Sequence, residues 1–157
     1  NKGEQQLDML VKKEKIFDNI VAVSGTKKEA IRTISRLCAK QTMLDATQLE
    51  KAFWKREEWD STGCGEGIAI PHAIIKEIDE VQLFIVRFRY PIEWESFDDK
   101  KVDIAFAIIA PEEKGQEKYL VFLSRLARKL VDEKFIADFR NCRSTEAVYQ
   151  YVKNELE

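Results

Sequence analysis

The segment VDIAFAIIA, residues 102–110, contains a single polar side chain, that of Asp103. A strand with one face in water alternates apolar and polar residues, whereas a strand covered on both faces is apolar almost throughout. The run is also far too short to span a membrane. It therefore predicts a buried central strand, with helices packed on both sides of its sheet.

Three more segments have the short, β-branched composition of strands, namely residues 16–23, 68–70 and 81–90. Apolar residues at helical spacing predict five helices, which begin near Thr26, Asp45, Gln116, Asp132 and either Ser144 or Thr145. The predicted order of elements is β-α-α-β-β-β-α-α-α. No internal repeat or linker divides the chain, so residues 1–157 are expected to form one domain. Residues 1 to about 10 are expected to be a lead-in that is disordered or left from cloning.

The composition excludes several classes of protein. The chain has 157 residues, 45% of them hydrophobic, which is too many for a disordered protein. Its net charge of −2 offers no general attraction to nucleic acid, so no direct nucleic-acid partner is expected. It has one histidine and three cysteines, none in Cys-x-x-Cys spacing, so neither a metal site nor a disulfide framework is expected. Reduced thiols are typical of a cytoplasmic protein.

The single histidine, His72, follows a glycine-rich segment and a short strand that Pro71 is expected to end. A loop rich in glycine can present backbone N–H groups to an anion such as a phosphoryl group. The residues that could bind such a group are Ser61, Thr62, Gly63, Gly65 and Gly67. Two interpretations stay open from these residues alone: a catalytic histidine beside an anion-binding loop, or, more commonly, a structural histidine after a plain turn.

Arg56 is placed at the end of the apolar stripe of the second predicted helix, which includes Phe53. The simpler interpretation is a cation at a helix C-terminus, where it is electrostatically favoured, paired with Glu57 or Glu58. The alternative is a guanidinium beside His72 that binds phosphoryl oxygens through two parallel hydrogen bonds.

Other motifs are absent or unpromising. The glycine segment has neither the Lys-Ser/Thr of a P-loop nor the Gly-x-Gly-x-x-Gly fingerprint, so nucleotide binding is not expected. Cys64 is expected to be buried or otherwise unreactive. The three tryptophans, Trp54, Trp59 and Trp94, are expected in the core or at its rim.

Arg56-Glu57 and the run STGCGEGIAIPHA (61–73) together closely resemble the active-site signature of enzyme IIA domains of the phosphoenolpyruvate-dependent sugar phosphotransferase system. Within the fructose/mannitol class, the run EGIAIPHA (66–73) is nearer to the fructose branch. Further matches follow in order along the chain, namely PIEW (91–94), Asp98, Val102-Asp103, APE (110–112) and LSRLA (123–127). The resemblance therefore covers essentially the whole chain.

The resemblance implies a three-layer α/β/α sandwich with a mixed central sheet, in agreement with the predicted order of elements. It implies that His72 accepts a phosphoryl group from the phosphohistidine of the carrier protein HPr. His72 would pass the group to a IIB domain, and so indirectly to the membrane component IIC, during sugar uptake. Arg56 matches the family's arginine and would stabilise charge on the transferred oxygens. Donor and acceptor are both activated side chains, so the transfer requires no ATP, other cofactor or bound metal.

Tyr119 is where the sequence departs from the family's pattern. Family members commonly carry a second active-site histidine at this position. A tyrosine hydroxyl can donate a hydrogen bond to a phosphoryl oxygen but cannot become a cation near neutral pH. Alternatively, Tyr119 is simply the first residue of an apolar helical stripe. The departure favours a second hypothesis, a regulatory IIA-like domain, for example within a transcription regulator, whose His72 phosphorylation state is sensed by a partner.

Overall fold

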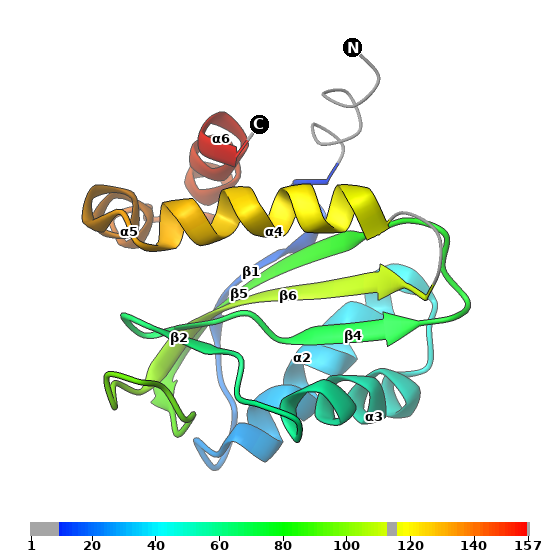
Figure 1. Ribbon diagram of the computed structural model, residues 1–157. Coiled ribbons are helices and arrows are strands. Elements are labelled where there is room, and N and C mark those ends of the chain that lie inside the picture. Colours follow the sequence, from blue (N-terminus) through cyan, green and yellow to red (C-terminus); the bar gives the residue numbers. More distant parts are fainter. Residues whose placement is uncertain (1–9, 113–115, 157) are drawn as a thin grey trace.

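Strand β6 (Val102–Pro111) lies at the centre of a mixed sheet that carries helices on both faces (Figure 1). The computed structural model describes residues 10–112 and 116–156, so the expected lead-in over residues 1–9 lies outside the described residues. Six strands within these residues form one sheet in the order β1-β5-β6-β3-β2, with β4 also paired to β6. The other strands are β1 (Ile16–Ile20), β2 (Gly63–Gly65), β3 (Ile68–Ala69), β4 (His72–Ile75) and β5 (Gln82–Ile92).

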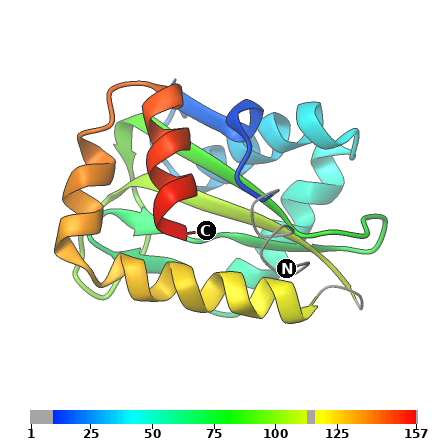
Figure 2. The same ribbon diagram turned by 90° about the horizontal axis from the view of Figure 1, so that it is seen from above.

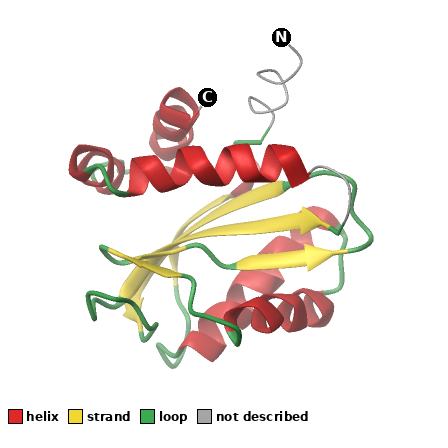
Figure 3. Cartoon of the chain, viewed as in Figure 1, coloured by secondary structure: helices red, strands yellow, loops and turns green. Residues whose placement is uncertain are grey.

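The helices form the two outer layers of the sandwich (Figure 3). One layer consists of α2 (Lys27–Thr42) and α3 (Ala46–Glu57). The opposite layer, which faces the viewer in Figure 2, consists of α4 (Gln116–Leu130), α5 (Glu133–Arg140) and α6 (Thr145–Leu156). A short 3-10 helix, η1 (Lys13–Lys15), precedes β1. Within the part of the chain that the structure covers, no helix is both long and apolar enough to cross a membrane.

The buried character predicted for β6 is confirmed. Residues 104–110 are each at most 2% exposed. Alternate side chains enter two separate cores because successive residues of a strand point to opposite faces. Ala105, Ala107 and Ile109 join the core beneath α2 and α3, whereas Ile104, Phe106 and Ile108 join the core beneath α4, α5 and α6.

Four of the five predicted helix starts are confirmed by side-chain caps, in which an oxygen accepts a hydrogen bond from a backbone N–H of the first turn, and the fifth is confirmed by the start of α4 at Gln116. The capping pairs are Thr26 with Glu29 at 3.3 Å, Asp45 with Gln48 at 3.1 Å, Asp132 with Lys134 at 3.0 Å and Ser144 with Ala147 at 3.0 Å. Ser144, rather than Thr145, therefore caps α6.

Two strands were not predicted. The expected glycine loop contains β2, which forms an antiparallel hairpin with β3, because glycine gives no propensity signal for a strand. The segment that begins at His72 is strand β4, because Pro71 ends β3 without ending the pairing with β6. Proline lacks an N–H but keeps its carbonyl, and the Pro71 carbonyl accepts a hydrogen bond of 2.9 Å from the Ile108 N–H.

Candidate functional site

His72 is the first residue of β4 and lies opposite Ile108 of β6, with its side chain half-buried. The hairpin of β2 and β3 leads directly into it, so the backbone before His72 is held by pairing to the buried central strand. The imidazole is therefore carried by a strand that is paired to the central strand of the sheet. Rigid elements of this kind hold a reacting side chain more accurately than a free loop does.

The turn of the hairpin requires glycine. Gly65, Glu66 and Gly67 all have positive φ, at 87°, 57° and 79°. A Cβ atom added to Gly65 would lie 2.5 Å from the ring of Phe97, so the space beside this residue is already filled. The Glu66 N–H donates to the Asp98 carboxylate at 2.7 Å, which fixes the turn to the loop before β6.

The hydroxyl groups of Ser61 and Thr62, expected to bind a phosphoryl group, both donate to protein acceptors. Ser61 Oγ donates to the Glu95 carbonyl at 2.7 Å and accepts a hydrogen bond of 3.2 Å from the Gly63 N–H. Thr62 is buried, and its Oγ1 donates to Glu57 at 2.6 Å. Each group would have to exchange its bond in order to donate to a phosphoryl oxygen, so their phosphoryl-binding role stays a prediction.

Glu57 is the buried acceptor at the centre of this region, only 5% exposed. Its carboxylate accepts hydrogen bonds from the Thr62 N–H at 2.8 Å, from Trp94 Nε1 at 3.0 Å and from Thr62 Oγ1. Lys27 at the start of α2 forms an ion pair of 2.7 Å with the same carboxylate. Glu57 thus ties the end of α3, the segment before β2 and the start of α2 into one unit.

The role of Glu57 was not predicted from the sequence, although a signal for its burial exists. Leu49, Phe53 and Glu57 are spaced by four residues, and all three are buried on one side of α3. The predicted stripe ends at Arg56, one position before the residue that is buried. A charged residue at the end of a buried stripe needs buried partners, and here they are Lys27 and Trp94.

Arg56 lies at the C-terminal end of α3 and is half-buried. Its Nη1 donates to the Asp60 carbonyl at 2.6 Å, and its guanidinium lies 5.7 Å from the centre of the Trp59 ring. Glu57 pairs with Lys27 and not with Arg56. The expectation that Trp59 lies in the core or at its rim is wrong: Trp59 follows the end of α3 at Glu57 and is 84% exposed, whereas Trp94 is buried.

The electrostatic surroundings of His72 favour its neutral form. Burial of the ring, and next the positive charge of Arg56, lower the pKa of His72 from 6.5 to about 4. A hydrogen bond to the Ile70 backbone and the negative charge of Glu57 act in the opposite direction but are the smaller effects. At neutral pH the imidazole therefore carries a lone pair on one ring nitrogen and can act as a nucleophile.

Cys64 and Tyr119 belong to β2 and α4. The Cys64 residue as a whole is exposed on the edge strand β2, but its sulfur is partly buried and donates a hydrogen bond of 3.4 Å to the Thr62 carbonyl. Burial of its sulfur, and next the charge of Glu57, raise the pKa of the Cys64 thiol to about 11, so it stays protonated and unreactive at neutral pH. Tyr119 belongs to α4, but its side chain lies outside the described residues.

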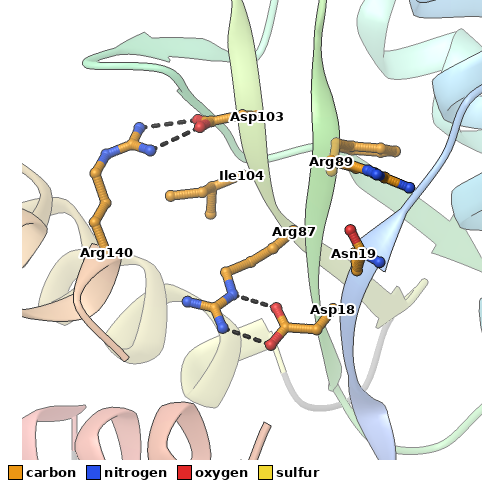
Figure 4. Close-up of a pocket in the computed structure, with 8 residues that line it drawn as sticks. Asp18, Asn19, Arg87, Arg89, Asp103, Ile104 and Arg140 are labelled. Atoms are coloured by element: carbon orange, nitrogen blue, oxygen red, sulfur yellow. Dashed lines mark hydrogen bonds and ion pairs between the residues drawn. The ribbon is translucent and has the colours of Figure 1, made fainter. Parts of the chain in front are cut away.

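A pocket of about 360 Å³ opens elsewhere, between β1, β5, β6 and α5 (Figure 4). His72 is not among the residues that line it. The lining consists of Asp18, Asn19, Arg87, Phe88, Arg89, Asp103, Ile104 and Arg140. The sequence gives no sign of this pocket because its residues come from four separate elements.

Comparison with known proteins places this geometry in a family. The family model described as "Phosphoenolpyruvate-dependent sugar phosphotransferase system, EIIA 2" matches residues 9–155. The chain is 36% identical to a "Nitrogen regulatory protein" of Escherichia coli (strain K12), over 81% of this chain and 78% of that protein. The crystal structure of nitrogen regulatory protein IIA-Ntr from Neisseria meningitidis is similar with a TM-score of 0.83 at 25% identity, covering 93% of this chain and 98% of that one.

The fold also extends to a more distant protein. The complex of enzyme IIAMTL and phosphorylated enzyme IIBMTL from Escherichia coli contains a chain similar with a TM-score of 0.69 at 21% identity. The alignment covers 90% of the present chain and 95% of that chain. The three-layer fold with a mixed sheet is therefore common to these proteins.

Proposed function

This chain belongs to the EIIA 2 family of the phosphoenolpyruvate-dependent sugar phosphotransferase system, and we propose that it carries its phosphoryl group on His72. The observation that carries the proposal is the position of His72, which is half-buried at the start of β4, directly after the glycine hairpin of β2 and β3. The lowered pKa of His72, about 4, supports the proposal because the ring is then neutral and nucleophilic at neutral pH. His72 is also the only histidine in the chain. The donor in this proposal is the phosphohistidine of an HPr-type carrier. Residues 1–157 act as one domain in this proposal. Its location is the cytoplasm, where thiols stay reduced.

The transfer exchanges one phosphorus–nitrogen bond for another. The lone pair on a His72 ring nitrogen attacks the phosphorus in line, while the electron pair of the donor's P–N bond returns to the donor imidazole. If the donor ring carries a proton on its other nitrogen, it leaves as neutral imidazole. His72 then keeps its own N–H and the new N–P bond, so that charge balances without water or an added cofactor.

Arg56 is proposed to stabilise the charge on the transferred oxygens. The positive charge of Arg56 lowers the pKa of the His72 ring, so this charge also acts on a group bound to that ring. The N–H groups of Gly65 and Gly67 are proposed to contribute in the same way, and the Tyr119 hydroxyl to donate a hydrogen bond. Positioning and charge stabilisation are the main demands of phosphoryl transfer.

We propose that the output of this carrier, meaning what its phosphoryl group is used for, is regulatory. Its 36% identity to a protein named "Nitrogen regulatory protein" supports a partner that reads the phosphorylation state of His72. The replacement of the family's second histidine by Tyr119 supports the same output. The second candidate is relay to a IIB domain for fructose or mannitol uptake, which the run EGIAIPHA (66–73) supports.

Both outputs are tested from the same phosphorylated protein. After incubation with phospho-HPr, an acid-labile phosphoimidazole signal in the phosphorus NMR spectrum is expected, and its absence would overturn the acceptor role of His72. The phosphorylated chain is then mixed with IIB domains of the fructose and mannitol type. Retention of the phosphoryl group on His72 supports the regulatory output, whereas rapid transfer to a IIB cysteine supports the sugar relay.

A further inference from the structure

The pocket between β1, β5, β6 and α5 holds charged groups that the proposed transfer does not use. Arg87 donates two hydrogen bonds to the carboxylate of Asp18. Arg140 donates to Asp103 at 2.7 and 2.9 Å (Figure 4). Both carboxylates are thus neutralised by guanidinium groups. The third arginine, Arg89, then gives the pocket an excess of positive charge.

Arg89 has no carboxylate partner among the residues that the structure describes. Its side chain is exposed, and the guanidinium lies 5.3 Å from the centre of the Tyr90 ring. Its neighbour in the pocket, Asn19, adds an amide and has a left-handed backbone with φ of 55°. The pairing of β1 with β5 is irregular at this point, between Phe17 and Ile20. Bulges and strained residues of this kind concentrate at ligand sites.

The other two guanidinium groups are oriented but not saturated. Beyond Asp18, Arg87 donates to the carbonyl groups of Cys142 at 2.8 Å and Phe139 at 3.4 Å. Beyond Asp103, Arg140 donates to the Glu66 carbonyl at 2.8 Å. A guanidinium has five N–H donors, so each of these arginines retains at least one. Carboxylates that hold arginines in place prepare them for an incoming anion.

We propose that this pocket binds the carboxylate or phosphate group of a small metabolite. Arg89 supplies the uncompensated charge, and Arg87, Arg140 and Asn19 supply directed N–H donors. The volume of about 360 Å³ lies within the range of small-molecule sites. Arg89, whose guanidinium is not paired with a carboxylate among the described residues, can donate parallel hydrogen bonds to two oxygens of a planar or tetrahedral oxyanion.

The bound anion would not touch His72 but would change the contacts of the hairpin that leads to it. This consequence rests on the proposed function of His72. Ile104 of the pocket and Ile108 opposite His72 are four residues apart on β6, roughly 13 Å along a strand. The link is Arg140, which binds the Glu66 carbonyl and would lie 2.6 Å from a Cβ added to Gly67. An anion that draws Arg140 away from Glu66 loosens this turn.

The test is a titration of the full chain followed through the arginine Nε–Hε NMR signals, with sodium phosphate and sodium citrate in separate series at constant ionic strength. Saturable shifts of the Arg89 and Arg140 signals with either anion are expected. In Arg89→Ala the apparent Kd of the Arg140 shift should rise at least about tenfold. Arg36→Ala, an exposed change on α2, should titrate like the wild type.

Phosphate bound at His72 would be recognised separately, because it moves the Arg56 signal and the ring signals of the only histidine. Arg56→Ala removes that second set of shifts and should leave the pocket's shifts in place. The proposal is overturned if neither anion gives saturable shifts at Arg89, or if Arg89→Ala titrates like the wild type. Shifts confined to Arg56 and His72 would also overturn it, while leaving the phosphoryl-carrier function standing.

Discussion

The indole Nε1 of Trp94 donates a hydrogen bond of 3.0 Å to the carboxylate of Glu57, the residue that directly follows Arg56. Glu57 is the shared acceptor for Trp94, Thr62 and Lys27, which belong to three separate segments. The end of α3 is therefore fixed by a buried charge rather than by apolar packing alone. Arg56, half-buried, keeps its position relative to His72 because its neighbour in the chain is held in this way.

Glu57→Ala is expected to lower the free energy of unfolding by about 3–5 kcal/mol, because the buried donors of Thr62 and Trp94 and the ammonium of Lys27 lose their acceptor. Urea unfolding followed by tryptophan fluorescence measures this loss. The matched control is Glu58→Ala, an exposed change at the next residue, which is expected to stay within about 0.5 kcal/mol of the wild type. A similar loss for both variants would refute the role assigned to Glu57.

The pKa of His72 can be read without ambiguity from the ring proton signals, because the chain has one histidine. A pKa of about 4 is expected in the folded protein. Arg56→Ala should raise it because a neighbouring positive charge is removed, and Glu57→Gln should lower it further because a negative charge is removed. A wild-type pKa near the ordinary value of about 6.5 would contradict the electrostatics described for the site.

Stability should depend on pH through the same group. The unfolded chain protonates His72 near pH 6.5, whereas the folded chain does so only near 4. Between these values the unfolded state binds more protons, so the stability that His72 contributes falls as the pH drops from 6.5 to 4. The difference between wild type and His72→Ala, measured by urea unfolding at several pH values, isolates this dependence. An unchanged difference across that window would argue against it.

Arg56→Ala is expected to slow phosphorylation of His72 by roughly 10²-fold, the usual effect of removing one group that stabilises transferred charge. Its melting temperature should change little, since Arg56 is half-buried and its contacts within the described residues are a hydrogen bond to the Asp60 carbonyl and a cation–π contact with the exposed Trp59 ring. Stopped-flow or quench kinetics with phospho-HPr give the rate, with Arg36→Ala as control. A large loss of melting temperature with normal kinetics would return Arg56 to a structural role.

Gly65→Ala is expected to destabilise the protein by roughly 1–3 kcal/mol, because φ is 87° at this position and the added Cβ would lie 2.5 Å from the Phe97 ring. Phe97 is 84% exposed, so Phe97→Ala alone should cost little. The double variant should recover the steric part of the loss and keep the backbone part. If the double variant recovers nothing, the contact with Phe97 is not the source of the cost.

The parts of the fold that were predicted from sequence are those set by local rules. The apolar run of β6 required helices on both faces, and capping residues such as Asp45 and Ser144 marked helix starts that the structure confirms. Strands β2 and β4 were not predicted because glycine carries no strand signal and because a proline, here Pro71, predicts the end of a strand. Their pairing depends on β6, which is distant in sequence.

The candidate site was predicted in part for the same reason. His72, Arg56 and the hairpin glycines lie in one continuous stretch, so their types and order could be interpreted directly. The spacing of Glu57 from Phe53 indicates a buried position, but its partners, Lys27 and Trp94, are brought to it only by the packing of α2 and the loop after β5 and could not be predicted. The charged pocket could not be predicted from the sequence because its arginines come from two elements, β5 and α5, that are distant in the chain.

The most direct test of the central proposal is the intact mass of the chain after incubation with phosphoenolpyruvate, enzyme I and HPr. The wild type is expected to gain the mass of one phosphoryl group and to lose it on mild acid treatment, whereas His72→Ala should gain none. A wild type that gains no mass, or a His72→Ala variant that gains as much as the wild type, would contradict the assignment of His72 as the phosphoryl acceptor.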